Sequence, residues 1–264
     1  MKKEKYVFAD TTEKQEWERL RLIEREFDPK TFHLLHQLGI QSGMECLELG
    51  PGAGSVMNWM LEKVGPKGQV TAIDLDIRFA AQTKASNLTI QKMNILDSKL
   101  KPESFDMIHG RYVVMHIPEY QRALSILNHS LKPGGWILLE EPDFGIAFPS
   151  NFEDDWGRTF TRISEAIKEL YQSMGIQWRM GRKVPSLFQN HGLQNLGTDV
   201  SAFMSKGGSG VSQIMKRSVE YLREPLLKTG KTLSKDVDLY IKLCDELSFW
   251  ATYYATFSTW GKKK

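Results

Sequence analysis

A glycine-rich segment between Glu48 and Ser55 carries the clearest chemical signal in this sequence. It reads ELGPGAGS and overlaps the end of an apolar stretch, Glu45 to Leu49, that predicts a strand. Glycine lacks a Cβ atom, so the backbone can turn sharply here and a ligand can approach the main chain closely. The helix expected next would present unpaired N–H groups to a carboxylate or a phosphate. The pattern predicts a ligand-binding turn, with an ordinary tight connection as the alternative.

Two common nucleotide-binding motifs do not fit this segment. The dinucleotide fingerprint G-x-G-x-x-G, begun at Gly50, requires glycine at position 55, where this chain has Ser55. The phosphate-binding pattern G-x-x-x-x-G-K-[ST] requires a lysine, and the residue after Ser55 is Val56. What remains is an acidic residue, Glu48, followed by three glycines at alternate positions.

Further polar residues follow the next predicted strands. Asp74 ends the second strand, 20 residues after Gly54, and Asp76 is the alternative for its role. Asn94-Ile95 follows the third strand and Gly110-Arg111 the fourth. Ligands of open α/β sheets bind at the carboxyl ends of the strands, so these residues are candidates for one site.

In this order the segments resemble the motifs of class I S-adenosylmethionine-dependent methyltransferases. The resemblance covers roughly residues 42 to 142, includes the turn LKPGGW from Leu131 to Trp136, and extends in general terms to the ubiquinone and menaquinone biosynthesis enzymes. It implies that S-adenosylmethionine is the cofactor and S-adenosylhomocysteine the product. The residues that it assigns to the cofactor are Glu48, Gly50, Pro51, Gly52, Gly54, Asp74, Leu75, Asn94, Ile95, Gly110 and Arg111.

The resemblance also implies individual roles. Asp74 is expected to accept hydrogen bonds from the ribose hydroxyls. Asn94 stands where the family commonly has an acid, and its amide oxygen can accept the same proton from the adenine amino group; the plainer interpretation of Asn94 is a turn former. The main-chain carbonyls of Gly110 and Arg111 are expected to bind the amino group of the cofactor.

Methyl transfer from a sulfonium is a one-step in-line displacement, which depends mainly on proximity and orientation. A general base is needed only when the acceptor still holds a proton. The candidates are His116, after strand four, and Asp143, after strand five, with Glu141 beside it. A plainer interpretation makes His116 a helix cap and Glu140-Glu141 a solvated strand end.

Alternating apolar strands and helices predict the elements that position these residues. The fold class expected is α/β: a Rossmann-like, mostly parallel seven-stranded sheet with helices on both faces. The predicted strands are Glu45 to Leu49, Gln69 to Asp74, Leu88 to Met93, Phe105 to His109 and Gly135 to Glu140. The predicted helices between them are Val56 to Val64, Ile77 to Ala85 and Glu119 to Leu131.

The flanking regions predict additions to this core. Helices are expected from Thr12 to Phe27, ending before Asp28-Pro29, and from Lys30 to Leu38. After strand five we expect a loop from Asp143 to Asn151 and a helical insertion. The later elements are a helix from Asp154 to Met174, a strand near Leu196 to Phe203, helices from Val211 to Leu227 and Ser234 to Leu247, and a strand from Phe249 to Trp260. The predicted division is an N-terminal extension (1–40), a cofactor-binding core (41–142) and a C-terminal part (143–264).

Composition narrows the function classes. The 264 residues include 35 basic and 32 acidic side chains, and the three terminal lysines account for the excess of +3. A charge-balanced body does not favour a nucleic-acid partner. No apolar run approaches the length needed to cross a bilayer, and two cysteines offer neither a disulfide framework nor a metal site. We expect a cytoplasmic protein with no membrane, metal or nucleic-acid partner, and a possible homodimer.

The leading hypothesis is therefore methyl transfer to an oxygen, nitrogen or carbon atom of a small organic molecule. A non-catalytic S-adenosylmethionine-binding or scaffold protein is the alternative from another class. A nucleic-acid methyltransferase is less favoured, because enzymes that methylate base amino groups usually carry Asn or Asp, two prolines and an aromatic after strand four. Here the chain reads GRYV from Gly110 to Val113.

Overall fold

The computed structural model describes residues 12–264, which divide into two compact units. The sheet unit comprises Phe27–Glu141, Met180–Asp199 and Phe257–Lys264. The helical unit comprises the described residues up to Glu26, Pro142–Arg179 and Val200–Thr256. The division at 1–40, 41–142 and 143–264 stays a prediction.

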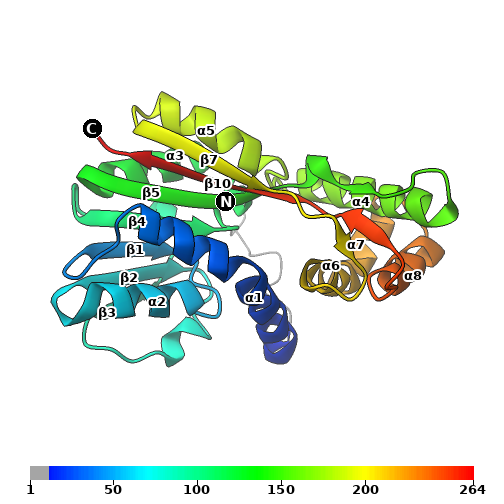
Figure 1. Cartoon of the computed structure of the whole chain (residues 1–264), viewed down its shortest axis with the longest axis horizontal. Coiled ribbons are helices and arrows are strands. Elements are labelled where there is room, and N and C mark those ends of the chain that lie inside the picture. The colour runs from blue at the N-terminus through cyan, green and yellow to red at the C-terminus, as the bar shows by residue number, and fades with distance from the viewer. Residues whose placement is uncertain (1–11) are drawn as a thin grey trace. The chain divides into compact units, whose positions relative to one another are not determined.

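A seven-stranded sheet forms the centre of the sheet unit, in the order β3-β2-β1-β4-β5-β10-β7 (Figure 1). Strands β1 to β5 pair in parallel. β10 runs opposite to β5, because Lys263 bonds to Gly134 at one end while Ser258 bonds to Glu140 at the other. The predicted fold class is confirmed. The strands are β1 (Glu45–Leu49), β2 (Gln69–Asp74), β3 (Leu88–Lys92), β4 (Phe105–Arg111), β5 (Leu131–Asp143), β7 (Gln194–Ser201) and β10 (Ala255–Lys262).

One face of this sheet packs against α1 (Glu13–Gln37) and α2 (Ser55–Val64). Side chains from both helices and four strands form one buried cluster, which includes Leu35, Met57, Cys46, Met107 and Leu138. Side chains alternate between the two faces of a strand, so this cluster identifies every second residue of β1, β4 and β5 as facing α1 and α2. Glu48, His109 and Glu140 share that face, one step closer to the carboxyl ends of their strands.

The predicted helix break before Asp28-Pro29 is wrong. α1 continues to Gln37 with Pro29 inside it, although proline removes one backbone donor from a helix. Side-chain bonds offset the loss: Asp28 accepts from Arg111 at 2.8 Å, and Thr31 accepts from the same guanidinium at 2.8 Å. Tertiary anchoring thus outweighs the local propensity at Pro29.

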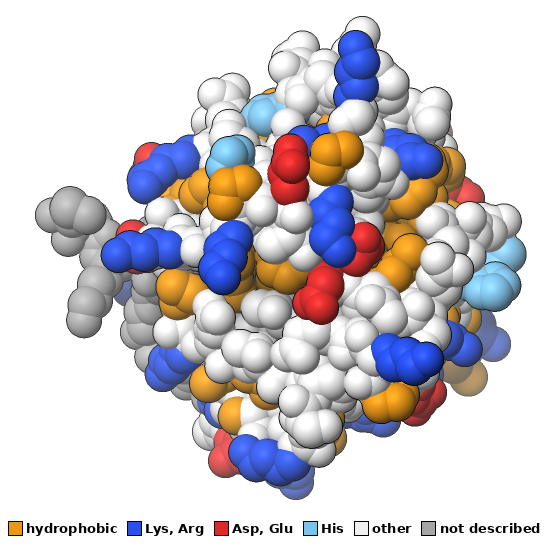
Figure 2. Space-filling view, turned by 90° about the vertical axis from the view of Figure 1, so that its left-hand side faces the viewer, with side chains coloured by type: hydrophobic (Ala, Val, Ile, Leu, Met, Phe, Trp, Pro, Cys, Tyr) orange, Lys and Arg blue, Asp and Glu red, His pale blue; other side chains and the backbone are white. Residues whose placement is uncertain are grey.

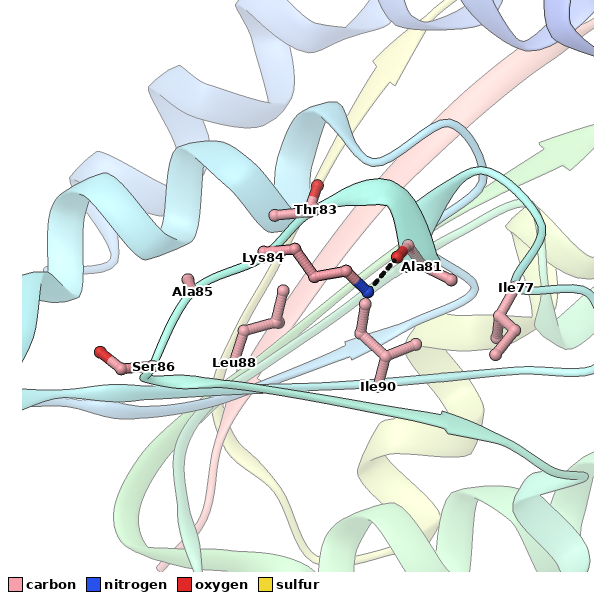
Figure 3. Close-up of a pocket in the computed structure, with 8 residues that line it drawn as sticks. All are labelled: Ile77, Ala81, Thr83, Lys84, Ala85, Ser86, Leu88 and Ile90. Atoms are coloured by element: carbon pink, nitrogen blue, oxygen red, sulfur yellow. Dashed lines mark hydrogen bonds between the residues drawn. The ribbon is translucent and has the colours of Figure 1, made fainter.

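The predicted helix from Ile77 to Ala85 is also wrong, because only a short 3-10 turn, η2 (Ala80–Gln82), forms there. Asp76 holds the start of this link in a local turn by accepting from the backbone and side chain of Arg78, at 3.2 and 2.7 Å. With no full helix over β3, a cavity of about 560 Å³ remains beside Leu88 and Ile90 (Figure 3). Lys84 crosses this cavity to donate to the carbonyl of Ala81.

Other helices of the sheet unit are α3 (Tyr120–Ser130), as predicted to within a residue, and α5 (Met180–Asn190), which the sequence pattern did not reveal. In the helical unit the long predicted helix is confirmed as α4 (Asp155–Ser173), which packs against α8 (Ser234–Leu243). The predicted helix from Val211 to Leu227 forms as α6 (Gly210–Tyr221) and α7 (Arg223–Lys228).

Short strands form in place of part of an expected loop and part of an expected longer strand. The predicted loop from Asp143 to Asn151 contains β6 (Phe148–Pro149), and the strand predicted from Phe249 to Trp260 divides into β9 (Trp250–Thr252) and β10. β6, β9 and β8 (Ser205–Lys206) form a second sheet in the order β6-β9-β8. All three strands of this small antiparallel sheet belong to the helical unit.

Candidate cofactor-binding site

The glycine turn follows β1 as expected and adopts a backbone that other residues rarely accept. Gly50, Gly52 and Gly54 have φ angles of 71°, 56° and 100°, all in the left-handed region. The Gly50 N–H donates to the carbonyl of Ile73 at 2.8 Å, which ties the turn to β2. α2 begins at Ser55, and its N-cap residue, Gly54, provides no side-chain cap. The start of this helix therefore presents N–H groups and a partial positive charge beside the turn.

Two of the predicted cofactor glycines also pack closely against the protein itself. A Cβ atom on Gly50 would lie 2.2 Å from Cγ2 of Val113, so this glycine makes room for the segment that leaves β4. A Cβ atom on Gly110 would lie 3.3 Å from the carbonyl oxygen of Leu49 on β1. The ends of β1 and β4 consequently approach each other closely at the site.

Asp74 lies at the end of β2 with its carboxylate against the glycine turn. It accepts from the N–H of Asp76 at 3.0 Å, and further backbone N–H bonds come from Leu75 and Gly52. Burial raises the pKa of Asp74 to about 6, against the effect of these donors, yet the residue keeps part of its surface exposed. Leu75 is 39% exposed, which leaves an apolar side chain open beside the carboxylate.

Asn94 and Ile95 follow β3 as a turn. The Asn94 side-chain oxygen accepts from the N–H of Leu96 at 3.0 Å and caps η3 (Ile95–Asp97). The turn-forming role of Asn94 is thus present in the structure. This bond still allows Asn94 to accept a proton from the adenine amino group, since an amide oxygen has two lone pairs. The Ile95 side chain is buried, so only its backbone is suited to a ligand.

The side chain of Arg111 is largely buried and bonds to α1 instead of extending into solvent. Its two terminal nitrogens donate to Thr31 and Asp28 on α1, each at 2.8 Å. Burial lowers the pKa of Arg111, but the charges of Glu140 and Asp28 outweigh it, so the pKa is raised. The next residue, Tyr112, has φ 58°, an unusual angle for a non-glycine residue, and its N–H donates to the carbonyl of Glu140. The backbone therefore turns abruptly where β4 ends.

Glu141 holds the segment after this turn, a role that the sequence pattern did not indicate. Its carboxylate accepts from the N–H groups of Val113, Val114 and Met115 at 3.1, 2.8 and 3.1 Å. The side chain is fully buried, and burial raises the pKa of Glu141 to about 8 while the three donors oppose the rise. Glu141 thereby fixes the 3-10 turn η4 (Val114–His116).

The two predicted base candidates occupy different units. His116 is the last residue of η4 in the sheet unit. Asp143 belongs to the helical unit, is 0% exposed, and accepts from the N–H of Gly145 at 2.7 Å to cap η5 (Phe144–Ile146). The capping contact is therefore the observed function of the Asp143 carboxylate.

A buried row of charges beside the glycine turn was not anticipated either. His109 lies between the carboxylates of Glu48 and Glu140. Strand register could have revealed it, because β1 and β5 both pair with β4 and all three side chains share the face that α1 covers. Glu48 was predicted as a cofactor residue, and its carboxylate is bonded to this histidine.

Within residues 12–264 no cluster of three or more His, Cys, Asp or Glu side chains is arranged to hold a metal ion. Nor is any helix in this range apolar and long enough to cross a membrane.

The strand order, the glycine turn after β1 and the acid after β2 together define a Rossmann-like fold with a ligand-binding turn. The chain belongs to the methyltransferase domain family, whose model matches residues 21–200. The family resemblance noted in the sequence is confirmed.

Among curated relatives, the chain is 32% identical over 136 residues to "Methyltransferase str3" of Strobilurus tenacellus, covering 50% of this chain and 48% of the relative. It is 25% identical over 154 residues to a demethylmenaquinone methyltransferase of Staphylococcus aureus, covering 53% and 64%. The match thus spans about half to two thirds of these relatives.

Solved structures with the same fold include two methyltransferases with named substrates. Phosphoethanolamine N-methyltransferase 2 of Haemonchus contortus, in complex with S-adenosylhomocysteine, has a TM-score of 0.59 at 16% identity, covering 93% of this chain and 57% of that one. Geranyl diphosphate C-methyltransferase of Streptomyces coelicolor has a TM-score of 0.54 at 12% identity, covering 97% and 86%.

Proposed function

We propose that this chain transfers a methyl group from S-adenosylmethionine to an oxygen, nitrogen or carbon atom of a small organic molecule. The observation that carries the proposal is the bond between the Asp74 carboxylate and the N–H of Gly52, within a turn of left-handed glycines. This bond brings the carboxylate that suits the ribose hydroxyls next to the glycine backbone, which has no side chains and suits the rest of the cofactor. Family membership supports the same reaction.

The residues present fit the cofactor. Asp74 binds the ribose hydroxyls, and the exposed side chain of Leu75 packs against the nucleoside. Asn94 and the backbone of Ile95 contact the adenine edge. The carbonyls of Gly110 and Arg111 accept from the ammonium group, while Glu48, Gly50, Pro51, Gly52 and Gly54 shape the turn. The bound cofactor supplies an activated methyl group on a positively charged sulfur.

The chain contributes orientation, exclusion of water and, for an acceptor that holds its proton, a base. His116 is the first candidate, because Glu141 fixes the turn that carries it. Asp143 is the second, because its Oδ1 atom accepts from Gly145 and a carboxylate has further lone pairs that can still take a proton. Replacing each by alanine or asparagine and measuring kcat with one acceptor at several pH values distinguishes the two.

The acceptor is proposed as a small molecule because named relatives and fold neighbours act on such compounds. One relative is a demethylmenaquinone methyltransferase, and two fold neighbours are named for phosphoethanolamine and geranyl diphosphate. A cytoplasmic location and a homodimer complete the proposal. Acidic side chains lie among the basic ones on the face drawn in Figure 2. The near balance of 35 basic and 32 acidic side chains in the whole sequence favours a small-molecule acceptor over a nucleic acid.

Two experiments test this function. Calorimetric titration with S-adenosylmethionine, S-adenosylhomocysteine and a nicotinamide dinucleotide should give binding of the first two only. Binding of the dinucleotide alone would defeat the proposal. Release of S-adenosylhomocysteine across a library of phenols, quinols, amines and carboxylic acids should then identify an acceptor. Tight cofactor binding with no turnover on any acceptor would favour the scaffold alternative.

A further inference from the structure

The charges next to the glycine turn form a connected row across three neighbouring strands. Glu48 on β1 lies directly opposite His109 on β4, and Arg111 on β4 lies opposite Glu140 on β5. All four residues face α1, at the end of an otherwise apolar surface of the sheet. The row therefore begins at the acid of the glycine motif and ends at β5.

His109 is bonded at both ring nitrogens. Nδ1 lies 2.7 Å from Oε2 of Glu48, and Nε2 lies 3.2 Å from Oε2 of Glu140. Glu140 also accepts from Thr31 on α1 and, at 2.7 Å, from Ser258 on β10. His109, Glu48 and Glu140 are each no more than 2% exposed, so no solvent shares these contacts.

These contacts favour a cationic histidine. Burial lowers the pKa of His109, but the charge of Glu48 and the bonds to both carboxylates outweigh burial and raise the pKa to about 9. Burial acts in the opposite sense on Glu140, where His109 and Arg111 lower the pKa to about 2. In the imidazolium both N–H groups donate, one to each carboxylate.

Stability alone is a weak reason for such a row. The desolvation of buried ion pairs offsets much of their attraction, and apolar residues of similar volume are often as stable or more so. The two hydrogen bonds of His109, called here its Glu48 arm (through Nδ1) and its Glu140 arm (through Nε2), also differ in what they connect. The Glu140 arm is tied to Thr31 and Ser258, whereas the Glu48 arm ends two residues before Gly50.

We propose that His109 is a positioning residue for the cofactor: its Nδ1–H holds Glu48, and thereby keeps the end of β1 and the Gly50 turn in the conformation that binds S-adenosylmethionine. The Nε2 arm anchors the ring to the scaffold. This inference rests on the proposed function and concerns the same site.

Two isosteric substitutions separate the arms. The side-chain nitrogen of asparagine superposes on Nδ1 of histidine, and that of glutamine on Nε2. His109→Asn therefore keeps a donor for Glu48 alone, and His109→Gln keeps one for Glu140 alone. Both remove the same charge, so a difference between them reports on which arm is kept. Cofactor affinity is measured by calorimetry and the free energy of unfolding by urea titration.

We expect the affinity of His109→Gln for S-adenosylmethionine to fall about tenfold or more, and that of His109→Asn to fall by less than about threefold, with comparable losses of stability. Equal affinities in the two variants would overturn the inference. Ser258→Ala is the matched control, because it removes a buried bond to Glu140 and leaves Glu48 untouched. Its affinity should equal that of the wild type.

Proton NMR of the wild type keeps the inference testable if both variants fail to fold. Saturation with S-adenosylmethionine should shift the Nδ1 proton of His109 more than the Nε2 proton, and an unshifted Nδ1 proton would overturn the inference. A wild type that does not bind S-adenosylmethionine refutes the proposed function instead. The two failures are thus distinguishable.

Discussion

Asp74 should make cofactor binding depend on pH near 6. Its pKa is raised to about 6 by burial in the free protein. Only the ionised carboxylate can accept from both ribose hydroxyls, so S-adenosylmethionine should bind less tightly as the pH falls through 6. At pH 5 about a tenth of Asp74 is ionised, and the dissociation constant should increase up to about tenfold relative to pH 7.

Two neighbouring groups, Asp76 and His109, keep their charge across this window. The pKa of Asp76 is lowered by Arg78 in spite of burial, and the pKa of His109 is about 9. Calorimetry between pH 5 and 7 measures the dissociation constant directly. Asp74→Asn should bind about thirtyfold more weakly at pH 7, a loss of about 2 kcal/mol for the charge-assisted bonds, and should show no slope.

Asp76→Asn is the matched control, because it removes a nearby carboxylate that bonds to Arg78 instead. This variant should keep the wild-type slope. A dissociation constant of the wild type that stays constant from pH 7 to pH 5 would refute the role of Asp74, and so would a slope that persists in Asp74→Asn. If Asp76→Asn alone lost the slope, the role would belong to Asp76.

Three further predictions concern the framework of the site. Gly50→Ala places a Cβ atom 2.2 Å from Val113 at φ 71°, so urea unfolding should show a loss of about 1–3 kcal/mol that Val113→Ala partly restores. The pKa of Glu141 is about 8, above its ordinary 4.5, so its contribution to stability is fully present below pH 4.5 and is lost as the pH rises through 8. Stability should therefore fall by at most about 1.4 kcal/mol per pH unit in this range. Thermal unfolding at several pH values should show this slope in the wild type and not in Glu141→Gln. Arg111→Met leaves Asp28 without its bonded cation and should cost about 3–5 kcal/mol, much of which Asp28→Asn in the same chain should recover; additive losses would contradict the pairing.

The sheet was predictable because its signals are local and repeated. Each strand from β1 to β5 contains a short apolar stretch that is followed by a polar or glycine residue, and this pattern depends little on distant contacts. The errors lie where tertiary bonds decide. Pro29 remains inside α1 because Asp28 and Thr31 bind Arg111, which lies about eighty residues later in the chain. No propensity at Pro29 contains that information.

The candidate site divides in the same way. Asp74 and the glycines could be placed from spacing alone, since one turn and one strand end bring them together. The residue that packs against Gly50 could not be predicted, because Val113 reaches Gly50 only through the left-handed turn at Tyr112. Glu141 was interpreted as a base candidate or a solvated strand end. Its true role depends on three N–H groups that only the folded β4 exit presents to it.

The buried charged side chains of the sheet unit gather at one end of the sheet. Glu141 is a buried acid and His109 is a buried cation at the carboxyl ends of β5 and β4, where Tyr112 also has a left-handed backbone. The same face is apolar further from that end, at Cys46 and Met107. Folded proteins retain strained backbone and buried charge mainly where a ligand is bound. The strained backbone and the buried charges at the ends of β4 and β5 therefore support the same binding edge that the glycine turn indicates. These residues lie outside the glycine motif.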